Sequence, residues 1–358
     1  MAKNKTQKSQ NMVVFDKKYY DSIMREFGYD PIEFEKIDFS LRNLKRDDLQ
    51  RRWLCHHDGN IFSSGLEKGN KSIVATGLGL SGVPHAGTMS QILRSITLQE
   101  AGVPVQMVLG DLDAYNGKMQ PLKTVLELAE RYKKFVSSLG FKQIHGSVLR
   151  SQFERPDVLR TSYLIGHFME DRMFNKAEED LHSFYSKRGK VDSQMSYRRK
   201  LSLNLMTADF IHLGLEDGYK NVLVMLGIDE HKYVEFGREN LRRIKEDGQF
   251  ENLDMTMSAM YSPIIKGFYG YPKMSKSFPE SAITADMRQS EIKERIIYGE
   301  GKYDKPENNV VYQMMASASF YCAKDIKSRY ELCLSGGDSW NNAKKEYADV
   351  LVEVCSKW

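Results

Sequence analysis

The stretch Lys71-Ser-Ile-Val-Ala-Thr-Gly-Leu-Gly-Leu-Ser-Gly-Val-Pro-His-Ala-Gly-Thr88 decides the fold that this sequence predicts. Its β-branched first part has the length of a buried strand, and a glycine-rich turn and a helix, from about Pro84 to Glu100, follow. Such a turn lets the backbone approach a phosphate, and the helix N-terminus points N–H groups at it. His85 adds a side-chain donor. The same turn is also common where it serves packing alone.

Strands and helices alternate through the middle of the chain. A second apolar run of strand length spans 104–109, and an amphipathic helix follows it and stops at Gly140. A third such run spans 221–226, with a helix near 232–247. This alternation is typical of a parallel sheet with crossover helices. The sequence therefore predicts an α/β fold.

Composition describes an ordinary globular protein. The chain has 358 residues, with 41% hydrophobic and 28% charged residues and a net charge of +4. No apolar run approaches the ~18–20 residues that cross a bilayer, and the N-terminus lacks the apolar core of a signal peptide. We therefore expect a cytoplasmic protein without membrane contact. The four cysteines form no C-x-x-C pair, so reduced thiols and no protein-bound metal are expected.

A second motif, Lys273-Met-Ser-Lys-Ser277, lies between glycine and proline residues far along the chain. Two lysines three residues apart, among small hydroxyl residues, make a compact cationic loop. Lysine ammonium groups suit the neutralisation of phosphate oxygens. A basic loop that is merely solvated is the alternative.

Together, these motifs resemble those of a class I aminoacyl-tRNA synthetase of the tryptophanyl/tyrosyl branch. Lys273–Ser277 is identical to that family's lysine loop, and His85-Ala-Gly-Thr88 matches its usual His-Ile-Gly-His with two departures. Gly227-Ile-Asp-Glu230 and the lead-in 22–29 resemble the eukaryotic and archaeal tryptophanyl type, whereas 110–115 is closer to archaeal tyrosyl enzymes. The likeness covers about residues 19–353.

The resemblance implies a domain organisation. It predicts a disordered basic tail at 1–18 and an N-terminal helical lead-in at 19–70. A Rossmann-like nucleotide-binding catalytic domain with a parallel sheet would span 71–282, with a helical insertion at about 155–200. A short C-terminal helical domain would span 283–358. Whether this short domain reads an anticodon is left open.

The resemblance also implies ATP-dependent activation of an amino acid, with Mg²⁺ arriving on ATP. His85, Lys273 and Lys276 would be catalytic, because phosphoryl chemistry of this kind depends on positioning and on stabilisation of charge. The residues implied for ATP binding are Gly77, Gly87, Thr88, Gly227, Asp229, Met274, Ser275 and Ser277.

The residues expected to bind the amino acid depart most from the family. They are Asp113, Tyr115, Met206, Asp209 and Glu230. Tryptophanyl enzymes have an aromatic residue where Ala75 aligns, and glutamines where Val108, Met206 and Glu230 align. Losing several polar anchors changes what the pocket can satisfy, since an unpaired buried polar group costs about 1–3 kcal/mol. We therefore expect a substrate other than tryptophan alone, although each carboxylate could also be structural.

Three functions follow from the sequence. The leading one is activation of an amino acid and its transfer to tRNA by a homodimer, as the resemblance implies. The second is a synthetase paralogue that activates a different amino acid for specialised-metabolite or peptide assembly. The third is a catalytically silent synthetase fold that binds RNA, which the intact lysine loop disfavours.

Overall fold

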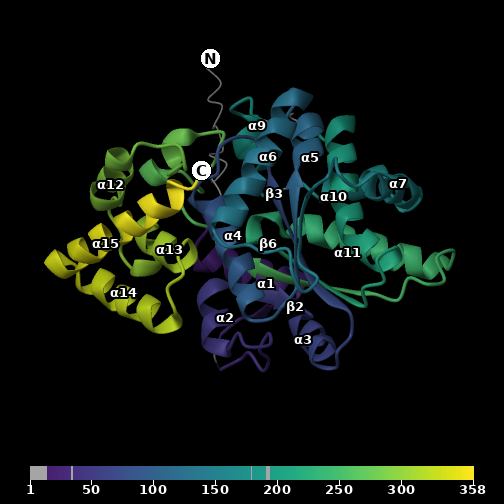
Figure 1. Ribbon diagram of the computed structural model, residues 1–358, viewed down its shortest axis with the longest axis horizontal. Coiled ribbons are helices and arrows are strands. Elements are labelled where there is room, and N and C mark those ends of the chain that lie inside the picture. Colours follow the sequence, from purple (N-terminus) through teal and green to yellow (C-terminus); the bar gives the residue numbers. More distant parts are fainter. Residues whose placement is uncertain (1–13, 34, 179, 191–193) are drawn as a thin grey trace, which may run out of the picture.

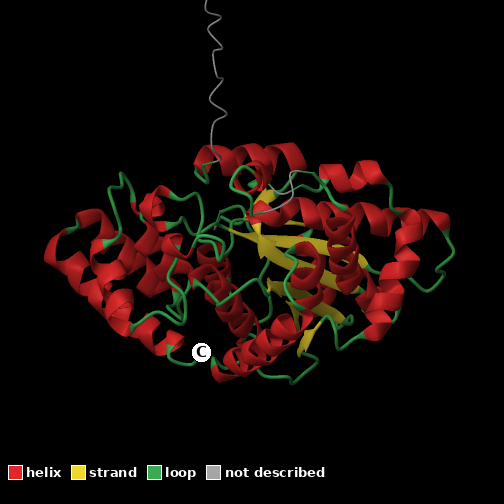
Figure 2. Cartoon of the chain, turned by 90° about the horizontal axis from the view of Figure 1, so that it is seen from above, coloured by secondary structure: helices red, strands yellow, loops and turns green. Residues whose placement is uncertain are grey.

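The computed structural model describes residues 14–33, 35–178, 180–190 and 194–358, and its centre is a mixed sheet with helices on both faces (Figure 1 and Figure 2). Within these residues, seven strands have the order β1-β2-β7-β6-β3-β4-β5. The five parallel strands are β3 (Ser72–Gly79), β4 (Val105–Gly110), β5 (Val148–Ser151), β6 (Asn221–Gly227) and β7 (Thr256–Ser262). The predicted α/β fold is confirmed.

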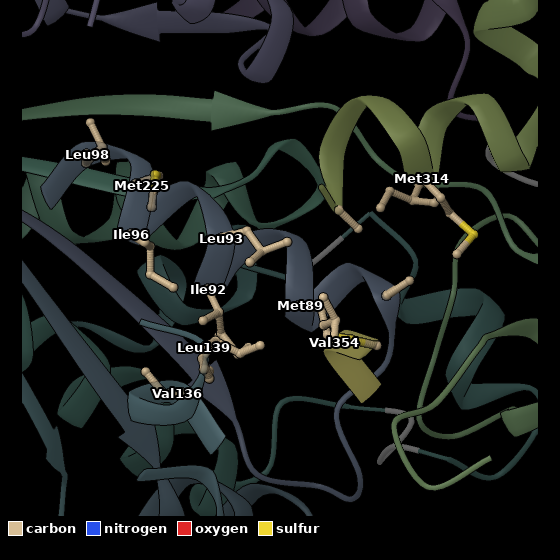
Figure 3. Packing of buried hydrophobic residues seen from close by; sticks show 14 of the residues in the cluster. Met89, Ile92, Leu93, Ile96, Leu98, Val136, Leu139, Met225, Met314 and Val354 are labelled. Carbon is tan, nitrogen blue, oxygen red and sulfur yellow. The ribbon is translucent and has the colours of Figure 1, made fainter. Parts of the chain in front are cut away.

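Both faces of the parallel sheet are buried, which explains why its strands read as continuous apolar runs. Val74 of β3 packs with α4 (Ala86–Glu100) and α6 (Leu122–Ser138), whereas Ile73 and Ala75 pack with α10 (Tyr197–Leu215) and α11 (His231–Asp247). Figure 3 shows the first of these clusters. It includes Met89, Ile92, Leu93, Ile96, Val136, Leu139 and Met225.

The predicted insertion at 155–200 is helical where the structure describes it. It contains α7 (Pro156–Ile165), α8 (Asp171–Lys176) and α9 (His182–Ser186), and α10 begins inside its last part. A shorter helix, α5 (Asp111–Gly117), follows β4 directly. In Figure 1, α7, α10 and α11 lie on the side of the sheet away from the C-terminal helices.

The lead-in at 19–70 is not purely helical, which corrects the prediction. It holds α1 (Lys17–Phe27), α2 (Arg46–Arg52) and α3 (Gly59–Glu67), but also the strands β1 (Asp30–Pro31) and β2 (Cys55–His57). β2 pairs antiparallel with β7, and β1 extends that edge, so the sheet is mixed. Strands of two and three residues are too short to show the alternation that identifies a strand in a sequence.

The predicted disordered tail at 1–18 lies mostly outside the described residues, which begin at residue 14. Its last part belongs to the fold. Phe15 is buried and packs edge-to-face on Tyr19, with ring centres 5.0 Å apart. Asp16 caps α1 by accepting a hydrogen bond of 3.0 Å from the Tyr19 amide. An apolar anchor and a cap therefore hold residues 15 and 16 in the fold, although the prediction placed them in the tail.

The C-terminal part contains the helices α12 (Gln289–Tyr298), α13 (Val310–Ser317), α14 (Ala323–Ser335) and α15 (Gly337–Cys355). These helices share one apolar cluster with α4, to which Met314 of α13, Val354 of α15 and Met89 of α4 all belong (Figure 3). Of the four thiols, Cys322 is exposed and the other three are buried. Among the described residues, no helix has both the length and the apolarity to cross a membrane.

Candidate active site

A cavity of about 400 Å³ opens at the carboxyl ends of β3, β4 and β6. The chain runs from β3 outward to β4 and β5 and then returns to β6 on the other side of β3. In open α/β sheets, ligands bind at such a reversal of strand order. Every predicted site residue except Tyr115 lines this cavity. Residues that are nearly two hundred positions apart in the sequence therefore meet there.

The N-terminus of α4 presents His85 to the cavity. His85 is the N-cap residue, and its Nδ1 accepts a hydrogen bond of 3.2 Å from the Thr88 amide, which leaves Nε2 as the donor for a ligand. A Cβ at Gly87 would lie 2.8 Å from Cε1 of this ring, so only glycine permits the arrangement. Burial, reinforced by Lys276 and Lys273, lowers the pKa of His85 to about 3. His85 is therefore neutral at pH 7.

Backbone hydrogen bonds bring the segment after the lysine loop onto this helix end. The Ala86 amide donates to the Ile283 carbonyl at 3.0 Å, and the Ala285 amide donates to the Pro84 carbonyl at 2.9 Å. The loop is closed by a bridge between Ser275 and Phe278. The two motifs that the sequence singled out thus form one wall of the cavity.

Lys276 lies at the glycine-rich turn. Its ammonium donates to the Gly79 carbonyl and lies 5.3 Å from the centre of the Tyr132 ring. Burial lowers its pKa to about 7, against the opposing effect of Glu230. A phosphate placed here would restore the ammonium charge, because an adjacent anion favours the protonated lysine.

Lys273 is paired with Asp229. Its ammonium donates to Asp229 Oδ2, and both side chains are largely buried. Asp229 follows β6, and a Cβ at Gly227 would lie 2.7 Å from Asp229 Oδ1, so glycine makes room for this carboxylate. Tyr185 of α9, which the sequence did not single out, lies with its ring 5.6 Å from the Lys273 ammonium. The insertion therefore reaches the lysine loop.

The side of the cavity that α10 forms contains a buried ion pair. Asp209 Oδ1 accepts a hydrogen bond of 2.7 Å from Arg150, and Oδ2 accepts one of 2.9 Å from Gln152. Arg150 also donates to Gln106 at 3.3 Å. Asp209 lines the cavity as predicted, but both of its oxygens have partners. Arg150 could not be foreseen, because nothing in the sequence places β5 opposite α10.

Tyr115 does not belong to the site, which corrects the prediction. In α5, Asp113 and Gly117 line the cavity, as does Gly110 just before it, whereas Tyr115 is 44% exposed. Two residues along an α-helix turn the chain by about 200°, so Tyr115 faces away from the side that Asp113 occupies. The helical spacing would have excluded it had the extent of this helix been known.

Other lining residues were not foreseen. Ser202 precedes Met206 and Asp209 by four and seven positions on α10, so it shares their face. That spacing was the signal that could have found it. Further residues of this kind are Thr76, Gln91, Gln152, Arg199, Leu203, Phe210 and Tyr233. Within the described ranges, no three His, Cys, Asp or Glu residues come together as a metal site would require.

Taken together, a glycine-rich strand-to-helix turn, a helix N-terminus and two lysines around one cavity define an α/β nucleotide-binding site. Comparison with known protein families then identifies the family to which the chain belongs. The family model described as tRNA synthetases class I (W and Y) matches residues 67–350. The chain belongs to this family, as its motifs predicted.

Individual relatives are more distant. Tyrosine–tRNA ligase of Archaeoglobus fulgidus is 27% identical over 216 residues, which are 59% of this chain and 59% of that protein. Tryptophan–tRNA ligase of Thermoplasma volcanium is 25% identical over 286 residues, which are 76% of this chain and 60% of that protein. The crystal structure of tryptophanyl-tRNA synthetase from Aeropyrum pernix K1 superposes with a TM-score of 0.75 at 20% identity, covering 95% of this chain and 93% of that one. This last likeness shows the shared fold.

Proposed function

We propose that this protein activates an amino acid with ATP to form an aminoacyl-adenylate and transfers it to tRNA, as part of protein synthesis in the cytoplasm. The observation that carries the proposal is the meeting of His85, the N-terminus of α4 and Lys276 at one end of the cavity. Three groups that suit an anion converge there, and the family to which the chain belongs is defined by this chemistry.

In the proposed reaction, a carboxylate oxygen of the amino acid attacks the α-phosphorus of ATP. The new O–P bond forms as the bond to the β-phosphate oxygen breaks, and pyrophosphate leaves with its electron pair. His85 Nε2 would donate to a phosphate oxygen, and Lys276 would stabilise the charge on the departing pyrophosphate. Asp229 would accept from ribose hydroxyls once ATP competes for Lys273.

Magnesium is expected to enter on ATP. Because the described residues offer no cluster of three metal ligands, the phosphates themselves would hold the ion. Bound Mg²⁺ would neutralise phosphate charge.

Two candidate functions differ in the amino acid that the protein activates. The curated relatives are tyrosine and tryptophan ligases, and the matches span only 59% and 60% of their lengths. The buried Arg150–Asp209 pair favours the second candidate, a paralogue that activates a different amino acid, because Arg150 and Gln152 occupy a carboxylate that was expected to bind the substrate.

A homodimer is part of the proposal. The face of α7 carries Leu159, Tyr163 and Leu164, and the Tyr163 side chain is 88% exposed. Large apolar groups gathered on one helix support a contact with a second copy. Tyr163→Glu should then convert a dimer to a monomer in sedimentation, whereas a wild-type monomer would refute this part.

The test of the function is ATP–pyrophosphate exchange with each common amino acid, with and without total tRNA. Exchange with one or a few amino acids, followed by charging of tRNA, is the expected result. Exchange without charging would favour the paralogue. Silence with every amino acid would favour a catalytically silent, RNA-binding protein.

A further inference from the structure

Tyr132 on α6 is a buried aromatic residue that meets both motifs of the site although it does not line the cavity. The residue is fully buried, and its hydroxyl donates a hydrogen bond of 2.9 Å to the Gly82 carbonyl in the glycine-rich turn. The centre of its ring lies 5.3 Å from the Lys276 ammonium. The turn and the lysine loop adjoin at this point, because a Cβ at Gly82 would lie 3.8 Å from the Lys276 Cβ. One residue of a crossover helix therefore contacts both segments.

The Tyr132 ring is held in place by other aromatic side chains. Trp358, which follows α15, packs edge-to-face on it with ring centres 5.0 Å apart. The same indole packs edge-to-face on Phe135 at 5.4 Å, and the Arg131 guanidinium lies over it at 4.4 Å. Aromatic pairs of this geometry add to the stabilisation that burial provides. The ring that Lys276 meets is therefore fixed by its packing.

Lys276 makes two contacts of different kinds at the turn. It donates to the Gly79 carbonyl, a bond that a bound phosphate would replace, and it lies over the Tyr132 ring. The face of an aromatic ring attracts an ammonium group, most strongly where water is excluded. A phosphate in the cavity need not displace this second contact, since Tyr132 lies outside the cavity. The ring can therefore hold the lysine at the turn both before and after a nucleotide binds.

We propose that Tyr132 is a positioning residue for Lys276, whose ammonium its ring holds at the glycine-rich turn, where the phosphates of ATP are proposed to bind. This inference rests on the proposed function. The bond from the Tyr132 hydroxyl to Gly82 sets the orientation of the ring. Tyr132 itself touches no substrate, and its effect on the reaction passes through Lys276.

The test is a double-mutant cycle of Tyr132→Leu and Lys276→Met in ATP–pyrophosphate exchange. Tyr132→Leu removes the ring and should lower kcat about fivefold to tenfold, the factor to which an ammonium–ring contact corresponds. KM for the amino acid should stay within about twofold. In the Lys276→Met background the same substitution should change kcat by less than about twofold, since the group that the ring positions is already absent.

Tyr347→Leu is the matched control. Tyr347 is equally buried in the same apolar cluster, but its hydroxyl donates to the Ala318 carbonyl, at 3.1 Å, instead of to the glycine-rich turn. This variant should melt lower than the wild type, as Tyr132→Leu does, with kcat within about twofold of the wild type. Tyr132→Phe, which keeps the ring, should recover most of the rate that Tyr132→Leu loses.

Three kinetic results would overturn the proposal. Equal losses in the two backgrounds would mean that Tyr132 acts on the fold and not through Lys276. A loss of kcat in Tyr347→Leu as large as in Tyr132→Leu would have the same meaning. A kcat of Tyr132→Leu within about twofold of the wild type would show that the ring does not position the lysine.

A second measurement needs neither a stable variant at position 132 nor activity. In the ligand-free wild-type protein, isotope-labelled at the lysine ε-carbon, the NMR signal of the Lys276 ε-methylene protons should be shifted upfield by the Tyr132 ring, and it should be missing from Lys276→Met. A spectrum without such a signal would overturn the proposal. If the wild-type protein exchanges with no amino acid, the proposed function fails, whereas this signal still decides whether the ring holds Lys276.

Discussion

The two halves of the cavity are built differently. The half that is proposed to bind ATP comes from two short segments, the turn into α4 and the lysine loop, and it consists largely of backbone groups, glycines and lysines. The half that is proposed to bind the amino acid is assembled from single side chains on β4, α5 and α10 and directly after β5, which lie far apart in the sequence.

This difference between the two halves separates the residues proposed for the reaction from the residues proposed to select the substrate. Lys273–Ser277 reproduces the family's loop, and it lines the cavity. Met206, Glu230 and the Arg150–Asp209 pair depart from the expected pocket. A motif match therefore supports the reaction, whereas the substrate depends on side chains that no motif contains. Five expected results test this contrast.

The largest effect is expected from Lys276→Ala. Loss of one group that stabilises the transferring phosphates should slow activation on the order of 10²-fold or more, with little change in KM for the amino acid. Pyrophosphate exchange measures both constants. A rate within about threefold of the wild type would remove the lysine loop from the mechanism.

In the other half, Asp209→Asn should act on stability. It leaves the buried Arg150 guanidinium without its counter-charge, at a cost of about 3 kcal/mol in the free energy of unfolding. Urea denaturation measures this cost. Asp254→Asn, which breaks an exposed pair with Lys220, is the matched control and should unfold like the wild type. Equal stability of both variants would contradict the claim that the buried Arg150–Asp209 ion pair stabilises the fold.

His85 has two roles that substitution can separate. His85→Ala removes the cap of α4, at about 1 kcal/mol, and also the phosphate donor. His85→Asn keeps a capping acceptor and should melt near the wild type while losing at least about 10-fold in ATP-dependent activity. If His85→Asn kept full activity, the residue would be structural only.

The lowered pKa of Lys276 predicts that ATP binding and the free energy of unfolding both depend on pH. Its pKa of about 7 should rise when phosphate binds, so ATP binding should take up part of a proton at pH 8, and Lys276→Met should abolish that uptake. Between pH 7 and 10.5 the unfolded chain binds this proton more tightly than the folded protein. The wild-type free energy of unfolding should therefore rise with pH across that window, relative to Lys276→Met. Calorimetry in buffers of different ionisation enthalpy measures the uptake.

The smallest effect is expected from Tyr115→Ala. Because this exposed side chain lies off the cavity, KM and kcat should stay within about twofold of the wild type. A tenfold change in KM for the amino acid would mean that α5 turns this residue inward during the reaction.

The same contrast explains what the sequence could predict. The β3–α4 turn and the lysine loop carry their own signals, since glycine spacing and paired lysines are local properties. Arg150 carries none, because its position beside Asp209 arises from the register of β5 against β4, whereas Ser202 could be placed only by its helical spacing from Met206 and Asp209. β2 was missed for a related reason: three residues become a strand only because β7 offers them an edge.

The most direct test of the account is a crystal structure of the protein with a non-hydrolysable ATP analogue. We expect the adenosine beside Gly87 and Gly227, and the phosphates within hydrogen-bond distance of His85 Nε2 and the Lys276 ammonium, with the Lys276–Gly79 bond broken. Phosphates bound elsewhere, or a nucleotide seated against Asp209 and Arg150, would contradict the assignment of the two halves.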